Sequence, residues 1–312
     1  MPVIARGLGL IAGVLADRVF GDPQRHHPVA WWAGGVQRAE KLLYRDQVAA
    51  GAALVAATTL PLAVAGVCAE RRGPLARFAA TAVTTWVVLG SRSLEHEACV
   101  MADALDRADL AKARARLPHL CGREPDLLGV DELARATVES VAENSCDAVV
   151  APLLWGAVAG VPGMLVHRGV NTLDAMVGHR SARYEKFGKV AARLDDAMAY
   201  LPARITGLLA CLASPEPRQA LKVMCRDHGK HPSPNGGWPE SAWAGGLGVQ
   251  LGGRNVYPGG VISERGRLGD GEPATAAAIR PAVGILRRVV AGATVTAVAT
   301  SAVAAGLRRW RR

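Results

Sequence analysis

Three carboxylates recur at helical spacing in the middle of the chain. Glu139, Glu143 and Asp147 are four residues apart, so on a continuous helix they share one face. Like charges in such a row repel one another unless a cation lies among them, and Mg²⁺ prefers oxygen ligands of this kind. Asp147 also stands at the edge of an uncharged stretch, where an idle charge is costly. A solvated acidic face explains the same spacing, and the residues alone leave the two interpretations evenly balanced.

A second group of polar residues follows that uncharged stretch, between positions 168 and 196. Acidic and basic side chains alternate there with apolar ones, beside segments that we expect to be membrane helices. This density of charge favours a site for a charged small molecule, with ordinary loop ion pairs as the alternative. The candidate residues are Arg168, Asn171, Asp174, Lys186, Arg193, Asp195 and Asp196.

Two loops rich in proline and glycine carry further candidates. The loop at residues 21–28 holds Asp22, His26 and His27 in a rigid turn. A capped loop is the favoured interpretation there, because turn residues are common, and metal or phosphate binding is the alternative.

The second loop, residues 226–239, contains Lys230, His231, Ser233 and Asn235. Its backbone N–H groups could cradle an anion, with Lys230 nearby. The spacing of Cys225, His228 and His231 is similar to that of a transition-metal site, but no fourth ligand is evident, so we disfavour it.

Composition favours a membrane protein over a soluble enzyme. Half of the 312 residues are hydrophobic, yet only 4% are aromatic. Small residues let helices approach closely, as they do in membranes. The net charge of +10 fits Arg-rich cytoplasmic segments and also attraction to an anionic lipid, nucleotide or phosphate. Nucleic acid is not an expected partner, because no recognition-helix pattern or zinc-finger spacing occurs. The six cysteines form no C-x-x-C pair, which argues against a disulfide framework.

Uncharged stretches predict an all-α, polytopic helical membrane protein with amphipathic and loop-rich cytoplasmic segments. Residues 48–69 carry no charge and, at 1.5 Å per residue, reach about 33 Å, enough for a bilayer core. A soluble or surface-lying amphipathic helix is expected over 93–117 and another helix over 131–143. The other candidate apolar helices of this single integral membrane domain, residues 1–312, are 1–20, 75–91, 148–166, 197–213 and 289–306.

The candidate helix at 148–166 is interrupted by Gly160-Val161-Pro162-Gly163. It could therefore be a straight span, a kinked span or a re-entrant hairpin. Only a segment that dips into the bilayer and returns would leave Asp147 on the same side as Asn171 and Asp174. A straight crossing would separate these residues and would argue against a shared site.

Taken together, these motifs resemble the CobD/CbiB-type adenosylcobinamide-phosphate synthases of cobalamin biosynthesis. Each motif alone is weak, but the ordered set covers nearly the whole chain and is specific. Cys146 and Gly236 stand where we expect other small residues, and these mild departures give no reason to doubt activity. The matching pieces are Gly21-Asp22-Pro23 with His27-Pro28, Glu143-Asn144-x-x-Asp147 with Ala151-Pro152-Leu153, Asn171-Thr172-Leu173-Asp174, Tyr184-x-x-Phe187-Gly188, Arg193-Leu194-Asp195-Asp196, Pro202-Ala203-Arg204, and His231-Pro232-Ser233-Pro234-Asn235 with Gly237-Trp238-Pro239.

The resemblance implies a multi-pass protein of the cell membrane with its active site on the cytoplasmic side. It implies a carbon–nitrogen ligase that uses ATP as co-substrate, together with Mg²⁺. The reaction joins adenosylcobyric acid to (R)-1-aminopropan-2-yl phosphate, or a related amino alcohol, and gives adenosylcobinamide phosphate. The lipid bilayer is an expected partner. A homo-oligomer, or association with later membrane enzymes of the pathway, is left open.

Under this interpretation each candidate residue has an expected role. Metal ligands are Glu143, Asp147 and Asp174. Catalytic residues are His27, Asp195, Asp196 and His231, and His231 could take the proton of the amine. Substrate or phosphate is bound by Asn144, Arg168, Asn171, Lys186, Arg193, Lys230, Ser233 and Asn235. No known nucleotide-binding fold is legible, so the way in which ATP is held is left open.

Two other classes of function compete with this one. Another Mg²⁺-dependent membrane transferase, acting on prenyl or phosphatidyl groups, needs paired D-x-x-x-D signatures, which Asp195-Asp196 does not supply. A non-catalytic membrane protein for assembly or transport predicts that single carboxylate or histidine substitutions are tolerated in every loop.

Overall fold

A computed structural model describes residues 2–22, 27–179 and 181–310 of the chain. Its internal contacts divide the chain into two compact units. The first unit comprises Met1–Gly90, Asp147–Ala199 and Ala293–Arg312, and the second comprises Ser91–Cys146 and Tyr200–Gly292. The single membrane domain expected from the sequence thus stays a prediction.

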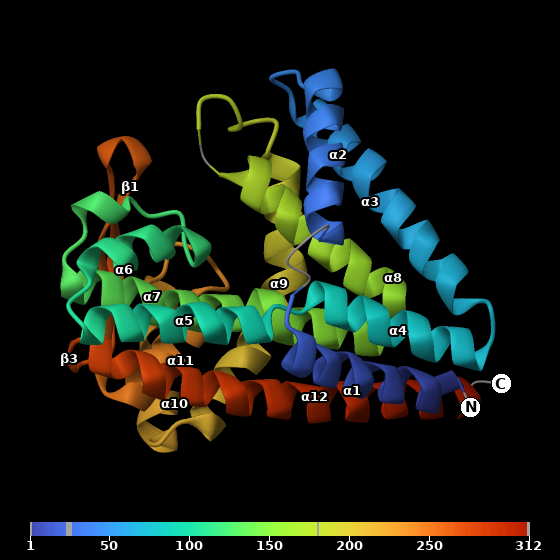
Figure 1. Ribbon diagram of the computed structural model, residues 1–312. Helices are drawn as coiled ribbons and strands as arrows, with labels where there is room; N and C mark the ends of the chain where they lie inside the picture. Colours follow the sequence, from blue (N-terminus) through green and yellow to red (C-terminus); the bar gives the residue numbers. More distant parts are fainter. Residues whose placement is uncertain (1, 23–26, 180, 311–312) are drawn as a thin grey trace. The chain divides into compact units, whose positions relative to one another are not determined.

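The first unit is built from long apolar helices, which Figure 1 shows as blue, cyan and olive ribbons. In Figure 1 helices α9 (Lys189–Ala213) and α12 (Ile279–Trp310) are also drawn, and each contributes one end to this unit. The remaining elements are α1 (Pro2–Phe20), α2 (Pro28–Leu43), α3 (Val48–Glu70), α4 (Pro74–Val88), the π-helical turn η3 (Cys146–Val150), α8 (Ala151–Leu173) and the π-helical turn η4 (Asp174–Gly178).

Three helical stretches of the described chain are long and apolar enough to cross a membrane. They are Val48–Glu70, Val130–Gly178 and Ala276–Ala304. These stretches include all or most of the predicted helices 48–69, 148–166 and 289–306 and agree with a mostly helical membrane protein. The predicted helices 1–20, 75–91 and 197–213 are also present, as α1, α4 and the second half of α9. In the described residues these three do not reach the length and apolarity of a span.

The second unit combines amphipathic helices with a small sheet. Strand β1 pairs antiparallel with β2 and parallel with β3, in the order β2-β1-β3. Its helices are α5 (Ser91–Asp106), α6 (Leu110–Arg116), α7 (Val130–Ser145), α10 (Pro217–Asp227) and α11 (Gly237–Leu247); its strands are β1 (Val249–Tyr257), β2 (Val261–Leu268) and β3 (Glu272–Pro273); its short 3₁₀ turns are η1 (Leu117–His119), η2 (Pro125–Leu127), η5 (His228–Lys230), η6 (Pro258–Gly260) and η7 (Ala276–Ala278).

The chain is mostly helical, as the sequence predicts, and this small sheet is an addition that the sequence did not predict. Its strands fall in the region rich in proline and glycine, where apolar and polar residues do not alternate clearly. Gly252 and Gly253 have φ of 80° at a register shift between β1 and β2, and such a bulge needs glycine. The glycines that weaken a strand pattern in the sequence are therefore the residues that shape this hairpin.

The predicted amphipathic helix over 93–117 is two helices rather than one. Helix α5 ends at Asp106, and α6 begins after Asp109, whose Oδ1 accepts a hydrogen bond from the Lys112 N–H over 3.0 Å. Asp109 is thus an N-cap inside the expected helix. The helix expected over 131–143 is α7, which starts one residue earlier than predicted and ends two residues later.

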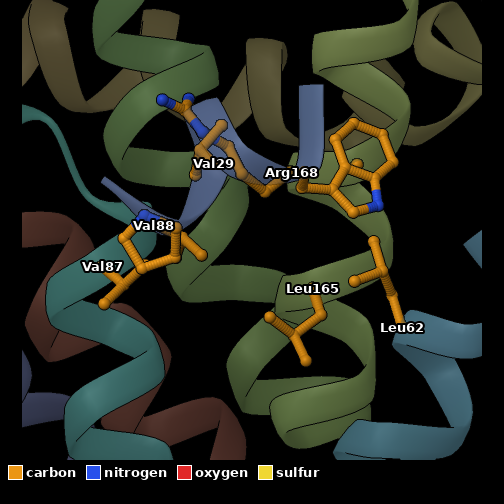
Figure 2. Close-up of a pocket in the computed structure, with 9 residues that line it drawn as sticks. Val29, Leu62, Val87, Val88, Leu165 and Arg168 are labelled. Carbon is orange, nitrogen blue, oxygen red and sulfur yellow. The ribbon is translucent and has the colours of Figure 1, made fainter. Parts of the chain in front are cut away.

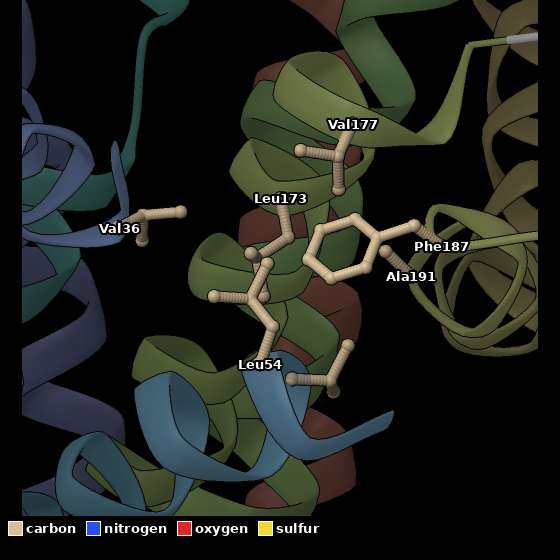
Figure 3. Close-up of a cluster of buried hydrophobic side chains, with 7 residues drawn as sticks. Val36, Leu54, Leu173, Val177, Phe187 and Ala191 are labelled. Carbon is tan, nitrogen blue, oxygen red and sulfur yellow. The ribbon is translucent and has the colours of Figure 1, made fainter. Parts of the chain in front are cut away.

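A buried apolar cluster fixes the end of α8 against α3 (Figure 3). In Figure 3, Leu54 of α3 points toward Leu173 of α8 and toward the ring of Phe187, which lies in the segment after η4. A Cβ on Gly51 would lie 1.8 Å from the Phe187 carbonyl oxygen, so only glycine allows this approach. The buried members are Val36, Leu54, Val55, Leu173, Val177, Phe187 and Ala191.

Helix α8 folds back on itself at Gly160. This residue has φ 72° and ψ −154°, a conformation that essentially only glycine adopts. A Cβ on Gly163 would lie 2.6 Å from the carbonyl oxygen of Trp155. Eight residues of straight helix would hold these two positions about 12 Å apart. The two arms of α8 therefore lie side by side as a helical hairpin.

Charged side chains satisfy the backbone at this turn. The Val161 N–H donates a hydrogen bond to Glu70 Oε1 over 3.0 Å. Arg6 donates to Glu70 Oε2 over 3.0 Å and to the Ala157 carbonyl oxygen over 3.4 Å. Broken helices are tolerated at membrane depth only when protein supplies such partners. Of the three alternatives for residues 148–166, the structure shows the hairpin, which reverses at Gly160.

Candidate functional site

The reversal of α8 brings together polar residues that are 24 positions apart. Asn171 Nδ2 donates hydrogen bonds to Asp147 Oδ2 and to Asp195 Oδ1, both over 3.4 Å. A straight helix would hold Asp147 and Asn171 about 36 Å apart. Three separate sequence motifs therefore meet at one end of the hairpin, within the first unit. We call Asp147, Asn171, Asp174 and Asp195 the aspartate cluster.

π-Helical turns place two members of the aspartate cluster at the ends of α8. Asp147 lies in η3 and Asp174 in η4. Such turns often occur at functional sites, because they change the direction in which side chains project. A Cβ on Gly178 would lie 1.8 Å from Asp174 Oδ1, so glycine leaves room for the Asp174 carboxylate across its own turn.

Negative charge accumulates in the aspartate cluster. Burial, and after it the carboxylates of Asp147 and Asp174, raise the pKa of Asp195 to about 8. Burial also raises the pKa of Asp196, the next residue on α9. The carboxylates supply only oxygen donors, and they repel one another. This chemistry fits Mg²⁺, which binds carboxylate oxygens and would offset the repulsion.

Arg168 interacts both with the aspartate cluster and with the loop at residues 21–28. Its guanidinium interacts electrostatically with Asp22 and Asp147, and His27 interacts with both Asp22 and Arg168. Burial lowers the pKa of His27, which favours the neutral imidazole. His27 also caps α2, because its Nδ1 accepts a hydrogen bond from the Val29 N–H over 3.2 Å. The neighbouring candidate His26 lies outside the described residues.

An apolar pocket of about 100 Å³ lies beside Arg168 (Figure 2). Helices α2, α3, α4 and α8 all contribute to it, and Arg168 is its charged member. The Nε of Arg168 is buried and makes no hydrogen bond within the described residues. An apolar group would complement this pocket, because its lining is almost entirely apolar. Its lining residues are Pro28, Val29, Trp32, Leu62, Val87, Val88, Leu165, Arg168 and Gly169.

A second polar cluster lies in the second unit. Glu143, His231 and Glu240 each offer one ligand atom, and these atoms lie within 4.8 Å of one another. His231 Nε2 is 3.2 Å from Glu240 Oε1 and 3.0 Å from an Nη of Arg265. Burial raises the pKa of Glu240 to about 6. Burial alone would lower the pKa of His231, but Glu240 and Glu143 outweigh it, so the pKa of His231 lies above its usual value.

Glu139 belongs to a separate network of ion pairs in the second unit. It pairs with Arg123, and its Oε1 also accepts hydrogen bonds from Arg135 over 3.2 Å and from the Gly252 N–H over 2.7 Å. Its charge is therefore already compensated. Neither interpretation left open for this row of carboxylates describes Glu139, which is buried and is a structural partner of arginines.

The loop at residues 226–239 is held by its own polar groups. Lys230 pairs with the buried Asp227 over 2.6 Å. Ser233 Oγ accepts a hydrogen bond from the Asn235 N–H over 3.2 Å, and Asn235 Oδ1 accepts one from Arg204 over 3.4 Å. These contacts give the loop a fixed shape. The binding of substrate by Lys230, Ser233 or Asn235 stays a prediction.

Three other predicted binding residues have no contact with either cluster among the hydrogen bonds and ion pairs described for them. Lys186 is exposed and pairs with Asp46 over 2.9 Å. Arg193 is exposed on α9. Asn144 Nδ2 donates to the Ser140 carbonyl oxygen of its own helix over 2.8 Å. Of the predicted metal ligands, Asp147 and Asp174 belong to the first unit and Glu143 to the second, and the binding of one ion by all three stays a prediction.

Sequence reasoning missed Glu240, Arg265 and Glu70. Glu240 had a signal, because it is the sole charged residue in the sequence of α11 and a lone charge in an apolar helix needs a partner. Arg265 and Glu70 had none. Their importance depends on contacts with residues more than thirty positions away.

Together, fold and site define a mostly helical membrane protein with carboxylate-rich polar clusters. A family described as CobD/Cbib protein matches residues 10–286. Cobalamin biosynthesis protein CobD of Mycobacterium tuberculosis (strain CDC 1551 / Oshkosh) is 45% identical over 298 residues, which cover 94% of this chain and 95% of that protein. The CobD proteins of Rhodobacter capsulatus and Geobacter metallireducens are 39% and 41% identical over 94% and 83% of this chain, and over 94% and 85% of their own lengths. The chain belongs to the CobD/CbiB family of cobalamin biosynthesis. No solved structure matches it.

Proposed function

We propose that this protein is an adenosylcobinamide-phosphate synthase, which joins adenosylcobyric acid to (R)-1-aminopropan-2-yl phosphate, or a related amino alcohol, at the expense of ATP. Membership of the cobalamin biosynthesis family supports substrates from that pathway. The convergence of Asp147, Asn171 and Asp195 carries the proposal, because it assembles a cluster suited to phosphate chemistry from separate family motifs.

The proposed reaction has two steps, because a free carboxylate is a poor acyl donor. A carboxylate oxygen of adenosylcobyric acid attacks the γ-phosphorus of ATP, the bond to ADP breaks, and an acyl phosphate forms. The uncharged amine then attacks the acyl carbon, and the carbon–oxygen bond to phosphate breaks. The amine gives up a proton to a base, and the products are the amide, ADP and inorganic phosphate.

Asp147 and Asp174 are the residues that would hold Mg²⁺ in this reaction. The ion, when bound, offsets the negative charge of the ATP phosphates. Arg168, whose Nε makes no hydrogen bond within the described chain, would bind an anionic oxygen of a substrate. The adjoining apolar pocket would exclude water from that contact. Glu143, which the sequence groups with these ligands, is not required for this arrangement.

Asp195 is the better candidate for the base that takes the proton of the amine. Asn171 holds its carboxylate at the aspartate cluster, where the phosphates would bind. In His231, by contrast, Nδ1 already accepts a hydrogen bond from the Ser233 N–H over 3.0 Å, and Nε2 faces Glu240 and Arg265. A base must have a free acceptor atom within reach of the proton that it takes.

We also propose the cell membrane as the location of the protein, with the aspartate cluster open to the cytoplasm, where ATP is available.

The test is a reaction of the purified protein in detergent with adenosylcobyric acid, aminopropanol phosphate and Mg·ATP, read by mass spectrometry. We expect one amide, one ADP and one phosphate per turnover. Asp147→Asn and Asp174→Asn should each abolish the product. Asp126→Asn, the same chemical change at an exposed site, is the matched control and should retain full activity. Folded wild-type protein that makes no amide would overturn the proposal.

A further inference from the structure

We infer that Glu143, His231 and Glu240 form a second metal site, in the second unit, for a divalent ion that accepts both nitrogen and oxygen ligands. One ligand atom from each of the three residues lies within 4.8 Å of the other two. Helices α7 and α11 supply the carboxylates, and the loop after η5 supplies the histidine. The inference does not depend on the proposed synthase reaction, because it concerns a different set of residues.

The burial of the Glu240 carboxylate is the observation that points to a bound cation. Its side chain is fully buried, with an exposed fraction of 0%. Apart from His231 Nε2, a proposed ligand of the same ion at 3.2 Å from Oε1, no hydrogen-bond donor satisfies its carboxylate oxygens within the described residues. A buried carboxylate normally has hydrogen-bond donors or a cation, because burial without them is costly. Its neighbour Glu139, which has three donors, shows how this protein satisfies a buried carboxylate when no metal is needed.

Arg265 supplies part of the missing charge in this structure. An Nη of Arg265 is 3.6 Å from Glu240 Oε1, and its other Nη donates a hydrogen bond to Tyr257 Oη over 2.8 Å. The 3.6 Å separation is longer than a hydrogen bond, so Arg265 does not satisfy the Glu240 carboxylate. A divalent ion bound by Glu240 would release Arg265 toward an anionic ligand.

The surroundings of His231 suit a metal ligand. A metal-bound imidazole donates its other N–H to an acceptor, which fixes the ring. In the structure Nδ1 accepts a hydrogen bond from the Ser233 N–H over 3.0 Å, so the ring proton of the neutral imidazole is on Nε2, toward Glu240. Binding of an ion at Nε2 therefore moves this proton to Nδ1, where the Ser233 carbonyl oxygen, 3.4 Å away, can accept the hydrogen bond. A Cβ on Gly236 would lie 2.8 Å from His231 Cε1 and 3.4 Å from Glu143 Oε1, so glycine keeps the space between these two ligands open.

The donor set indicates which ion would bind. One imidazole nitrogen and two carboxylate oxygens are suited to Mn²⁺, Fe²⁺ or Zn²⁺. Mg²⁺ prefers oxygen ligands alone, as in the aspartate cluster. Three protein ligands leave further positions for water or for an oxygen of a substrate. The two clusters are thus expected to differ in the metal that they select.

The experiment uses the full-length protein in detergent, loaded with Mn²⁺ and studied by pulsed electron paramagnetic resonance. Coupling to a ¹⁴N nucleus identifies a histidine ligand, whereas Mn²⁺ at the aspartate cluster gives no such coupling. We expect ¹⁴N coupling in the wild-type protein and in Asp174→Asn, and its loss in His231→Gln. Glu143→Gln, at a half-buried position that favours folding, should weaken the Mn²⁺ affinity of this site at least about tenfold.

Arg265→Gln tests whether the Arg265 guanidinium competes with the metal ion for the Glu240 carboxylate. Removal of the resident guanidinium should tighten Mn²⁺ binding, a result that a purely structural ion pair would not produce. Wild-type protein without ¹⁴N coupling at saturating Mn²⁺, or coupling that persists in His231→Gln, would overturn the inference. Because none of these measurements involves turnover, a failure here is separate from a failure of the synthase proposal.

Discussion

Replacement of Gly160 by alanine should disrupt the hairpin that assembles the aspartate cluster. The φ of 72° and ψ of −154° are unfavourable for alanine, at a cost of roughly 1–3 kcal/mol. The new Cβ would lie 2.2 Å from Glu70 Oε1 and 2.4 Å from a terminal nitrogen of Arg6, so Glu70 would have to leave the turn. The Val161 N–H would then lose its acceptor, which adds about 1–3 kcal/mol.

The expected loss of roughly 2–6 kcal/mol exceeds the effect of most single substitutions. Thermal unfolding in detergent should show a Tm at least about 4 °C below that of the wild-type protein. Amide formation should fall in parallel, because Asp147 and Asn171 would no longer be held together. The assay is therefore a pair of measurements, Tm and synthase rate, on the same preparation.

Gly73→Ala is the matched control for this substitution. Gly73 also has a positive φ, of 107°, but no neighbouring atom lies within 4 Å of the position that the alanine methyl group would take there. It therefore carries the backbone strain without the displacement of Glu70, and it should cost less stability than Gly160→Ala and leave the synthase rate unchanged. If Gly160→Ala had the wild-type Tm and rate, our account of the turn would be refuted.

Three further substitutions test other parts of the account. Asp195→Asn should reduce amide formation at least about 100-fold, because the side-chain amide cannot take the proton of the amine. It should not lower Tm, because the amide keeps the shape of the buried carboxyl group and carries no charge. A rate within twofold of wild type would contradict the role of Asp195 as base. Asp227→Asn should destabilise the protein by about 3 kcal/mol, because the buried carboxylate accepts hydrogen bonds from Arg226 and from the Gly269 N–H. The hydrogen bonds from Arg226 hold the pKa of Asp227 below its usual 3.8. The ionised Asp227 carboxylate therefore stabilises the folded protein fully above about pH 4, and this stabilisation is lost as the pH falls toward the folded-state pKa. The Tm difference between wild type and Asp227→Asn should accordingly be constant near neutral pH and shrink in acid, and a difference that grows in acid would be inconsistent with this. Lys186→Ala removes an exposed ion pair with Asp46 that is worth less than about 1 kcal/mol, so Tm should not change. A higher KM for the amino alcohol phosphate in this variant would show that Lys186 binds that substrate.

The long apolar helices of this protein were easier to predict from the sequence than the small sheet. The uncharged stretch 48–69 coincides with α3 almost to the residue, because length and apolarity decide such a helix locally. The hairpin of β1 and β2 was not expected, because its glycines interrupt any alternation of polar and apolar residues. Asp109 likewise divides an expected helix through a capping bond that competes with helical continuation.

The candidate site was only partly predictable for a different reason. Asp147, Asn171, Asp174 and Asp195 were identified from motifs, but the Gly-Val-Pro-Gly sequence was compatible with three shapes of α8. The structure decides among them through Glu70, which lies far away in the sequence and contacts Val161. A pattern within one segment cannot reveal such a partner. The same is true of Glu240 and Arg265, whose roles depend on the packing of three elements around His231.

The proximity of Asp147 and Asn171 is the central claim, and cross-linking measures it directly. In a variant that lacks the six native cysteines, Asp147→Cys and Asn171→Cys should be joined within one chain by a short bismaleimide in native membranes. The control pair is Asp147→Cys with Val158→Cys, an exposed position about 16 Å further along the same arm, and it should not react. Efficient cross-linking of the first pair is the result that we predict. No cross-link, as expected for a straight helix that separates these positions by about 36 Å, would contradict the account.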